Sequence, residues 1–214
     1  MNDFSRKTFP QQIASEIEGR IQSGKYRIGD KLPTEPQLSV RFGVSRGTIR
    51  EALKSLVSLG LLESRQGSGT YVVAKDRLQA AMYRKLSSSK PREIKNMCYM
   101  LEKEIAVSAS NERKDDDLPM LRRALDEAKA AFYSYGSRKS LQPFHLALSK
   151  ATHNTLLHSI YSYISEYNLE LPEDLGDDYI SGLELSRLYE ALYEAVAQQD
   201  GNEALSIMYR IAEA

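Results

Sequence analysis

The sequence predicts a mainly α-helical protein: an N-terminal winged helix-turn-helix (three helices plus a β-hairpin) joined to an antiparallel bundle of about six helices. Three observations lead to this fold class. Apolar residues recur at helical spacing along most of the 214 residues, and one glycine-rich hairpin signal lies near residue 67. The charge is also uneven, because residues 1–73 hold 11 basic and 7 acidic side chains while the whole chain is neutral. We therefore expect two modules with different partners.

Two helices are predicted before residue 43. Isoleucines at every fourth position from Ile13 to Ile21 indicate an amphipathic first helix. Thr34 is placed to cap a short second helix, with the Gln37 side chain reaching back in a capping box. Pro36 is tolerated there, because the first turn of a helix has no internal partners for its N–H groups.

A third helix is predicted over residues 46–58, with Ser45 as its N-cap. One face of this helix is apolar, and the other carries Arg46, Arg50 and Lys54 at i, i+4 and i+8. A helix capped in this way can enter the major groove of DNA with its N-terminus first, where arginines meet guanine edges. The alternative is that the three cations form an ordinary solvated face.

Two strands are predicted at residues 61–65 and 70–73, around a turn that contains Gln66 and Gly67. Glycine supplies the positive φ that a tight hairpin needs, and it lets the backbone approach another molecule closely. Two helices around a short turn, followed by a hairpin, describe a winged helix-turn-helix.

The stretch from Ile13 to Val73 resembles the DNA-binding domain of GntR-family bacterial transcription regulators. The resemblance rests on three ordered motifs, Gly29–Glu35 (GDKLPTE), Phe42–Leu53 (FGVSRGTIREAL) and Gly60–Val72 (GLLESRQGSGTYV). The family usually has arginine after the glutamate of the first motif, where this chain has Pro36. We therefore expect its operator to be read differently or more weakly.

The resemblance also implies roles for individual residues. Arg46 and Arg50 are expected to read bases, Ser45 and Thr48 to contact phosphate, and Gly67 to approach the minor groove. The predicted DNA-binding residues are Thr34, Ser45, Arg46, Thr48, Arg50, Lys54, Gln66 and Gly67.

The rest of the chain is expected to form a partly helical linker, residues 74–90, and an all-helical effector-binding and dimerisation domain, residues 91–214. A Pro/Gly/Asp-rich loop is expected over residues 171–181. Six helices are predicted from apolar stripes over residues 94–105, 118–132, 144–151, 156–167, 185–195 and 204–211.

This second module looks like the FCD domain of the FadR-type branch of the same family, over nearly all of residues 91–214. The resemblance is looser than that of the first module. Its anchors are Leu101, Glu102, Phe144, His145, His153, Asn154, Leu157, Asp200, Ala204 and Met208.

Many such domains hold a divalent metal through one Asp and three His, and the metal then binds a carboxylate effector. The corresponding positions here are Leu141, His145, Tyr189 and Ile211, so only one ligand remains. Cys98 stands where an effector-binding arginine is often found. Because one imidazole does not hold a metal tightly, we expect no metal and no other cofactor. His145 is expected to be a buried hydrogen-bonded residue or pocket liner, with metal binding as the minor alternative.

Tyrosines are concentrated in the last three helices, and each is individually most typical of a core or rim residue. The sharper hypothesis is a metal-free pocket, lined by Tyr189, Tyr193 and Tyr209, for a neutral or largely apolar effector. The predicted effector-pocket residues are Cys98, Glu102, Leu141, His145, Tyr189, Tyr193 and Tyr209.

The predicted function is that of a sequence-specific transcription regulator. We expect a homodimer that binds a double-stranded DNA operator, with an affinity modulated by a small-molecule effector. The alternative is a DNA-binding regulator with a vestigial pocket, which acts constitutively or through protein contacts.

Other classes are disfavoured by what the sequence lacks. It shows no nucleophile motif, phosphate loop, metal cluster or cofactor fingerprint, so we do not expect an enzyme. No apolar run approaches 18 residues, and the first residues lack the apolar core of a signal peptide. With a single cysteine there is no internal disulfide. We therefore expect a cytoplasmic protein without a membrane partner.

Overall fold

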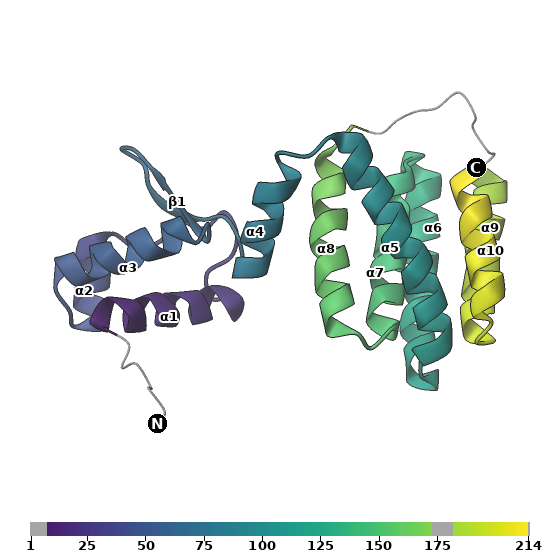
Figure 1. Ribbon diagram of the computed structural model, residues 1–214, viewed down its shortest axis with the longest axis horizontal. Coiled ribbons are helices and arrows are strands. Elements are labelled where there is room, and N and C mark those ends of the chain that lie inside the picture. Colours follow the sequence, from purple (N-terminus) through teal and green to yellow (C-terminus); the bar gives the residue numbers. More distant parts are fainter. Residues whose placement is uncertain (1–7, 173–181, 214) are drawn as a thin grey trace. The chain divides into compact units, whose positions relative to one another are not determined.

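The computed structural model describes residues 8–172 and 182–213 (Figure 1). The chain divides into two compact units, one ending at Ser87 and the other beginning at Ser88. The described elements are α-helices, short 3₁₀ turns and one two-stranded hairpin, so the predicted mainly α-helical class is confirmed. The expected loop at residues 173–181 lies outside the described residues.

The first unit has the predicted order of three helices and a hairpin. These elements are α1 (Phe9–Gln22), α2 (Glu35–Phe42), α3 (Arg46–Ser58), β1 (Leu62–Arg65) and β2 (Gly69–Val72). Its core is built mainly by the three helices, with smaller contributions from the hairpin and the chain on either side of it, and includes the fully buried Ile17, Leu38, Ile49, Leu56 and Leu61.

Local sequence sets the turn between α2 and α3. The Gln37 side chain accepts a hydrogen bond from the Thr34 backbone N–H (2.9 Å), which fixes the start of α2. Gly43 ends α2 in the left-handed conformation (φ 65°), where a β-carbon would be strained. Ser45 Oγ then accepts a hydrogen bond from the Thr48 N–H (3.1 Å), so α3 begins with a side-chain cap.

The hairpin is attached to the chain that precedes α2. β1 and β2 pair antiparallel, with Leu62 opposite Val72. On the other edge of β2, the Leu32 N–H donates to the Thr70 carbonyl (2.8 Å). The hairpin and the helix-turn-helix are thus joined by main-chain hydrogen bonds, and the wing has a fixed position relative to α3.

Helix α4 (Arg77–Leu86) packs with the first unit. Ala80 belongs to the core of that unit. The Arg77 guanidinium donates to both carboxylate oxygens of Glu18 on α1 (2.7 Å each), and the Glu18 side chain is only 12% exposed. The compact unit therefore continues past residue 73, where the sequence placed the end of the DNA-binding domain, because this helix buries apolar and charged groups against it.

The second unit contains six α-helices within residues 88–172 and 182–213, as predicted. They are α5 (Pro91–Glu112), α6 (Leu118–Tyr135), α7 (Gln142–Ala151), α8 (Thr155–Glu170), α9 (Gly182–Ala197) and α10 (Gly201–Glu213). Two 3₁₀ turns, η1 (Asp115–Asp117) and η2 (Arg138–Leu141), lead into α6 and α7. Helix α5 contacts α7, α8, α9 and α10, so it is the central element of the bundle (Figure 1).

A charged network joins α6 to α9. Arg122 contacts both Asp126 on its own helix and Glu190 on α9, and the Lys129 ammonium lies 2.6 Å from the second oxygen of Glu190. Hydrogen bonds from Arg122 and Lys129 outweigh partial burial and lower the pKa of Glu190 to about 2 from its ordinary value of 4.5.

This network is expected to make the stability of the second unit depend on acid pH. Because the pKa of Glu190 is lower in the folded protein, its contribution is complete above about pH 5 and is lost as pH falls toward 2. The side chain is about one-third exposed, so we expect about 1 kcal/mol after solvent screening. In urea titrations, the stability difference between wild type and Glu190→Gln should shrink from pH 6 to pH 3.

The matched control is Glu127→Gln, which removes a carboxylate from the exposed pair with Arg123 on α6. Its effect on the free energy of unfolding should be smaller than that of Glu190→Gln at pH 6. A Glu190→Gln effect that is the same at both pH values would contradict the prediction.

Candidate nucleic-acid interface and effector cavity

Helix α3 presents its basic face to solvent. Arg46, Arg50 and Lys54 are all exposed, whereas Ile49 and Leu56 on the opposite face are fully buried in the core. The sequence alone could not separate a reading helix from an ordinary solvated face. The fold now adds that this face belongs to the second helix of a helix-turn-helix, the element that such motifs insert into the major groove.

Arg50 and Arg46 differ in their surroundings. The Arg50 guanidinium donates to both oxygens of Glu35, the first residue of α2, at 3.2 and 2.9 Å. This contact, together with the charges of Arg46 and Lys54, keeps the pKa of the Glu35 carboxyl below its usual value. Arg46 has no ion pair in the part of the chain that the structure describes. Arg50 is therefore oriented before DNA arrives, while the full guanidinium of Arg46 is available.

The remaining predicted DNA-binding residues lie around this helix and on the wing. Ser45 and Thr48 form the start of α3, with their hydroxyl oxygens 2.9 Å apart. Thr34 is exposed at the start of α2, and Gln66 and Gly67 are exposed at the tip of the hairpin, where Gly67 has φ 71°. The structure thus brings all eight residues into the first unit, and their DNA contacts stay a prediction.

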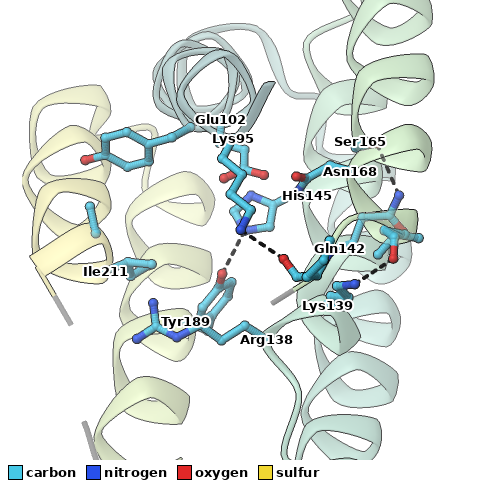
Figure 2. Close-up of a pocket in the computed structure, with 14 residues that line it drawn as sticks. Lys95, Glu102, Arg138, Lys139, Gln142, His145, Ser165, Asn168, Tyr189 and Ile211 are labelled. Atoms are coloured by element: carbon cyan, nitrogen blue, oxygen red, sulfur yellow. Dashed lines mark hydrogen bonds between the residues drawn. The ribbon is translucent and has the colours of Figure 1, made fainter. Parts of the chain in front are cut away.

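The second unit contains a cavity of about 290 Å³ between η2 and helices α5, α7, α8, α9 and α10 (Figure 2). This volume is near the lower end of the range for small-molecule sites. Most of its lining residues carry a polar group, although apolar atoms make up the larger part of the lining surface. The lining residues are Lys95, Tyr99, Glu102, Arg138, Lys139, Gln142, His145, Ser165, Asn168, Leu169, Pro172, Tyr189, Ile211 and Ala212.

Three of the seven predicted pocket residues line this cavity: Glu102, His145 and Tyr189. His145 and Tyr189 are buried, and His145 Nε2 lies 2.8 Å from the Tyr189 hydroxyl. Their rings meet edge to face at 5.4 Å between centroids. His145 is thus buried, hydrogen-bonded and part of the lining, and its role in effector binding stays a prediction.

The other four predicted pocket residues lie away from the cavity. Cys98 and Leu141 are buried, and neither is part of the lining. Tyr193 packs under the Arg122 guanidinium, and Tyr209 is 49% exposed beside Lys103. Tyr193 lies four residues after Tyr189, on the same side of α9 but one turn farther along it, where its ring meets Arg122 instead of the cavity. The three expected tyrosines therefore do not form one apolar pocket.

Most of the polar lining was not anticipated from the sequence. The missed residues come from α5, η2, α7 and α8, and they are Lys95, Tyr99, Arg138, Lys139, Gln142, Ser165 and Asn168. The one sequence signal that could have found some of them is the basic pair at residues 138–139, just before the third predicted helix of the second module.

The residues present do not fit the metal that such domains often hold. Leu141 and Ile211 offer no donor atom, and His145 Nε2 is already paired with Tyr189. Within residues 8–172 and 182–213 there is no group of three His, Cys, Asp or Glu side chains placed to hold a metal ion. A metal is therefore given no role in effector binding.

Cys98 is expected to be chemically inert in the folded protein. Burial, and secondarily the charge of Glu102, raises the pKa of its thiol to about 12, so the reactive thiolate is scarce near neutral pH. Titration with a disulfide reagent at pH 8 should show slow modification in buffer and rapid modification of one thiol in urea. Equally fast reaction in both conditions would contradict this burial.

None of the helices in the described ranges combines the length and apolar content needed to cross a membrane. A winged helix-turn-helix with an exposed basic helix, followed by a helical unit with an internal cavity, defines the class of two-module transcription regulators. In line with this class, residues 9–72 match the model for bacterial regulatory proteins of the gntR family, and residues 93–214 match the FCD domain. The chain belongs to the GntR family, and its second unit is an FCD domain.

Relatives support this assignment over the whole chain. The HTH-type transcriptional regulator LutR of Bacillus subtilis (strain 168) is 32% identical, over 88% of this chain and 90% of LutR. The Uxu operon regulator of Haemophilus influenzae is 28% identical, over 100% of this chain and 82% of that protein. The solved structure of Streptococcus agalactiae GntR has a TM-score of 0.59 and 25% identity, over 95% and 97% of the two chains. The protein is a DNA-binding transcription regulator and not an enzyme.

Proposed function

We propose that this regulator binds its operator as a homodimer and that a small-molecule effector, bound without metal in the cavity of the FCD domain, changes its operator affinity. The observation that carries the proposal is the cavity itself. It lies between helices of the FCD domain and combines apolar walls with a few charged and hydrogen-bonding side chains, as small-molecule sites do, whereas a vestigial pocket would be filled by apolar side chains.

Operator recognition is assigned to α3 and the wing. Arg46 and Arg50 are suited to read guanine edges, since a guanidinium matches the two acceptors of guanine. Ser45, Thr48 and the N–H groups of the first turn of α3 are suited to phosphate. A single winged helix reads few base pairs, so two copies on paired half-sites are needed for a specific operator.

Coupling between the two units is assigned to the chain around Ser87 and Ser88. Helix α4 is held to the first unit by Ala80 and by the contact between Arg77 and Glu18. A change in the FCD domain would therefore move α4 and the DNA-binding unit together. In a dimer, such movement would alter the fit of two recognition helices to their half-sites.

The test begins with selection of operator DNA from a random duplex pool by the full-length protein. Binding to the selected operator is then measured by fluorescence anisotropy, with a metabolite library, in the presence of EDTA and separately with zinc. We expect at least one metabolite to change operator affinity about 5-fold or more in EDTA. A response only with zinc would overturn the metal-free site, and no response to any metabolite would favour the constitutive regulator.

A further inference from the structure

The charged side chains of the cavity are not equivalent. Two of its three cations are engaged with the main chain: the Lys95 ammonium donates to the Pro172 carbonyl (2.9 Å) and the Lys139 ammonium to two carbonyls at the end of α8 (2.6 Å each). Both lysines thus hold the C-terminal end of α8 in place. Arg138 and Glu102 are the other two charged residues of the lining.

Glu102 is held in a fixed orientation by one neutral donor. Its Oε1 accepts a hydrogen bond from the hydroxyl of Tyr161 (2.8 Å), and Tyr161 is fully buried. No cation forms an ion pair with Glu102 in the described ranges 8–172 and 182–213. The carboxylate therefore lines the cavity without a cation in direct contact, within the described residues.

Arg138 provides the opposite charge on the other side of the cavity. It stands in η2, whose start is fixed by the Ser137 side chain, which accepts from the Lys139 N–H (3.2 Å). Across the part of the chain that the structure describes, its guanidinium has neither an ion pair nor a hydrogen bond. Figure 2 shows Glu102 and Arg138 toward opposite ends of the cavity, with His145 and Tyr189 between them.

Tyr189 gives independent support for this arrangement. Burial raises the pKa of its hydroxyl well above the ordinary value; Glu102 raises it further and Arg138 lowers it. Both charges therefore act on the same hydroxyl, which stays protonated as a hydrogen-bond donor. In addition, His145 Nδ1 and Asn168 Oδ1 are buried without a hydrogen-bond partner in the described structure. Such atoms favour a polar ligand over the neutral, largely apolar effector expected from the sequence.

We propose that the cavity binds a small zwitterion, an α-amino acid or a similar ammonium carboxylate, with its carboxylate on Arg138 and its ammonium on Glu102. A simple carboxylate would leave Glu102 unmatched and close to a like charge, and a simple amine would do the same to Arg138. Only a ligand with both charges neutralises both ends. The role of this ligand in regulation rests on the proposed function; its binding does not.

The experiment measures binding to the full-length protein in EDTA by isothermal titration calorimetry. The probes are the twenty proteinogenic L-amino acids, each with the amine that lacks its α-carboxylate and the acid that lacks its α-ammonium. We expect at least one amino acid to bind with a Kd below about 1 mM. Its amine and its acid should bind at least about 10-fold more weakly, because each leaves either Glu102, which is partly buried, or Arg138, which is exposed, without an opposite charge.

Two variants assign the ends of the ligand. Glu102→Gln should weaken binding of the amino acid about 10-fold or more. Its affinity for the acid analogue should be unchanged or higher. Arg138→Gln should weaken binding of both the amino acid and the acid, and should leave the affinity for the amine unchanged. The matched controls are Glu127→Gln and Arg123→Gln, which remove the same charges from the exposed surface of α6 and should leave all three affinities unchanged.

The proposal is overturned if no amino acid binds, or if an acid analogue binds wild type as tightly as its amino acid. Its failure can be told apart from failure of the proposed function. Another metabolite that shifts operator affinity in EDTA would leave the proposed function standing. An amino acid that binds with the expected variant pattern but leaves operator affinity unchanged would support the zwitterion site and contradict effector control.

Discussion

Replacing Arg46 with alanine is expected to weaken operator binding by about 1–3 kcal/mol, or about 5- to 150-fold, and to relax the preference at one base pair. Arg46 is exposed at the first position of α3 and has no ion pair in the described structure, so its whole guanidinium is available for a guanine edge. Fluorescence anisotropy at one fixed salt concentration, on the selected operator and its single-base variants, measures both effects.

Arg50→Ala is also expected to weaken operator binding, by an amount in the lower part of the range given for Arg46→Ala. Two of the donor groups of Arg50 already contact Glu35, so part of its hydrogen bonding would have to be exchanged on DNA. Arg123→Ala, which removes an exposed arginine from α6, is the control and should leave operator affinity unchanged. Unchanged affinity in both Arg46→Ala and Arg50→Ala would contradict the assignment of α3 as the reading helix.

The largest stability effect is expected for Phe144→Ala. Phe144 is fully buried in the core of the FCD domain, and its ring meets Tyr189 edge to face at 6.0 Å. Removing a buried phenyl ring leaves a cavity and costs about 3–5 kcal/mol, a large part of the stability of an ordinary domain. Urea unfolding followed by far-UV circular dichroism measures the loss in free energy of unfolding. Amide hydrogen exchange shows which helices are destabilised.

The exchange experiment also tests whether the two units unfold separately. Phe144→Ala should speed exchange in α5 to α10 and leave α1 to α3 at wild-type protection, because the units have separate cores. Tyr135→Ala, at an 81% exposed position, is the control and should change stability by less than about 0.5 kcal/mol. Equal loss of protection in both units would show that they unfold as one.

The first unit was predictable in detail because its signals are local. The Thr34 capping box, the left-handed Gly43 and the Ser45 cap each lie within a few residues of the group they satisfy, and the structure has all three. Local signals do not reveal pairing between distant segments. The Arg50–Glu35 contact joins residues 15 apart, and Arg77–Glu18 joins residues 59 apart, so the sequence pattern predicted neither.

The cavity was predictable only in part, for the same physical reason. The resemblance to the FCD domain pointed to Glu102, His145 and Tyr189, and these three side chains line the cavity. Tyr193 shares a side of α9 with Tyr189 but lies one turn farther along, under Arg122, and Tyr209 lies at an exposed position of α10. The sequence pattern marks neither displacement. Arg138 stands in a 3₁₀ turn, where no amphipathic pattern marks orientation.

The packing of α4 decides where this protein can be recombined with others. A hybrid regulator cut after residue 73 would discard Arg77 and Ala80, leaving the nearly buried Glu18 carboxylate without its partner and the core of the donor unit open to solvent. A cut at Ser87 keeps these contacts within one piece. The serine-rich stretch after α4 is thus the natural fusion point at which foreign sensor domains could be joined to this DNA reader.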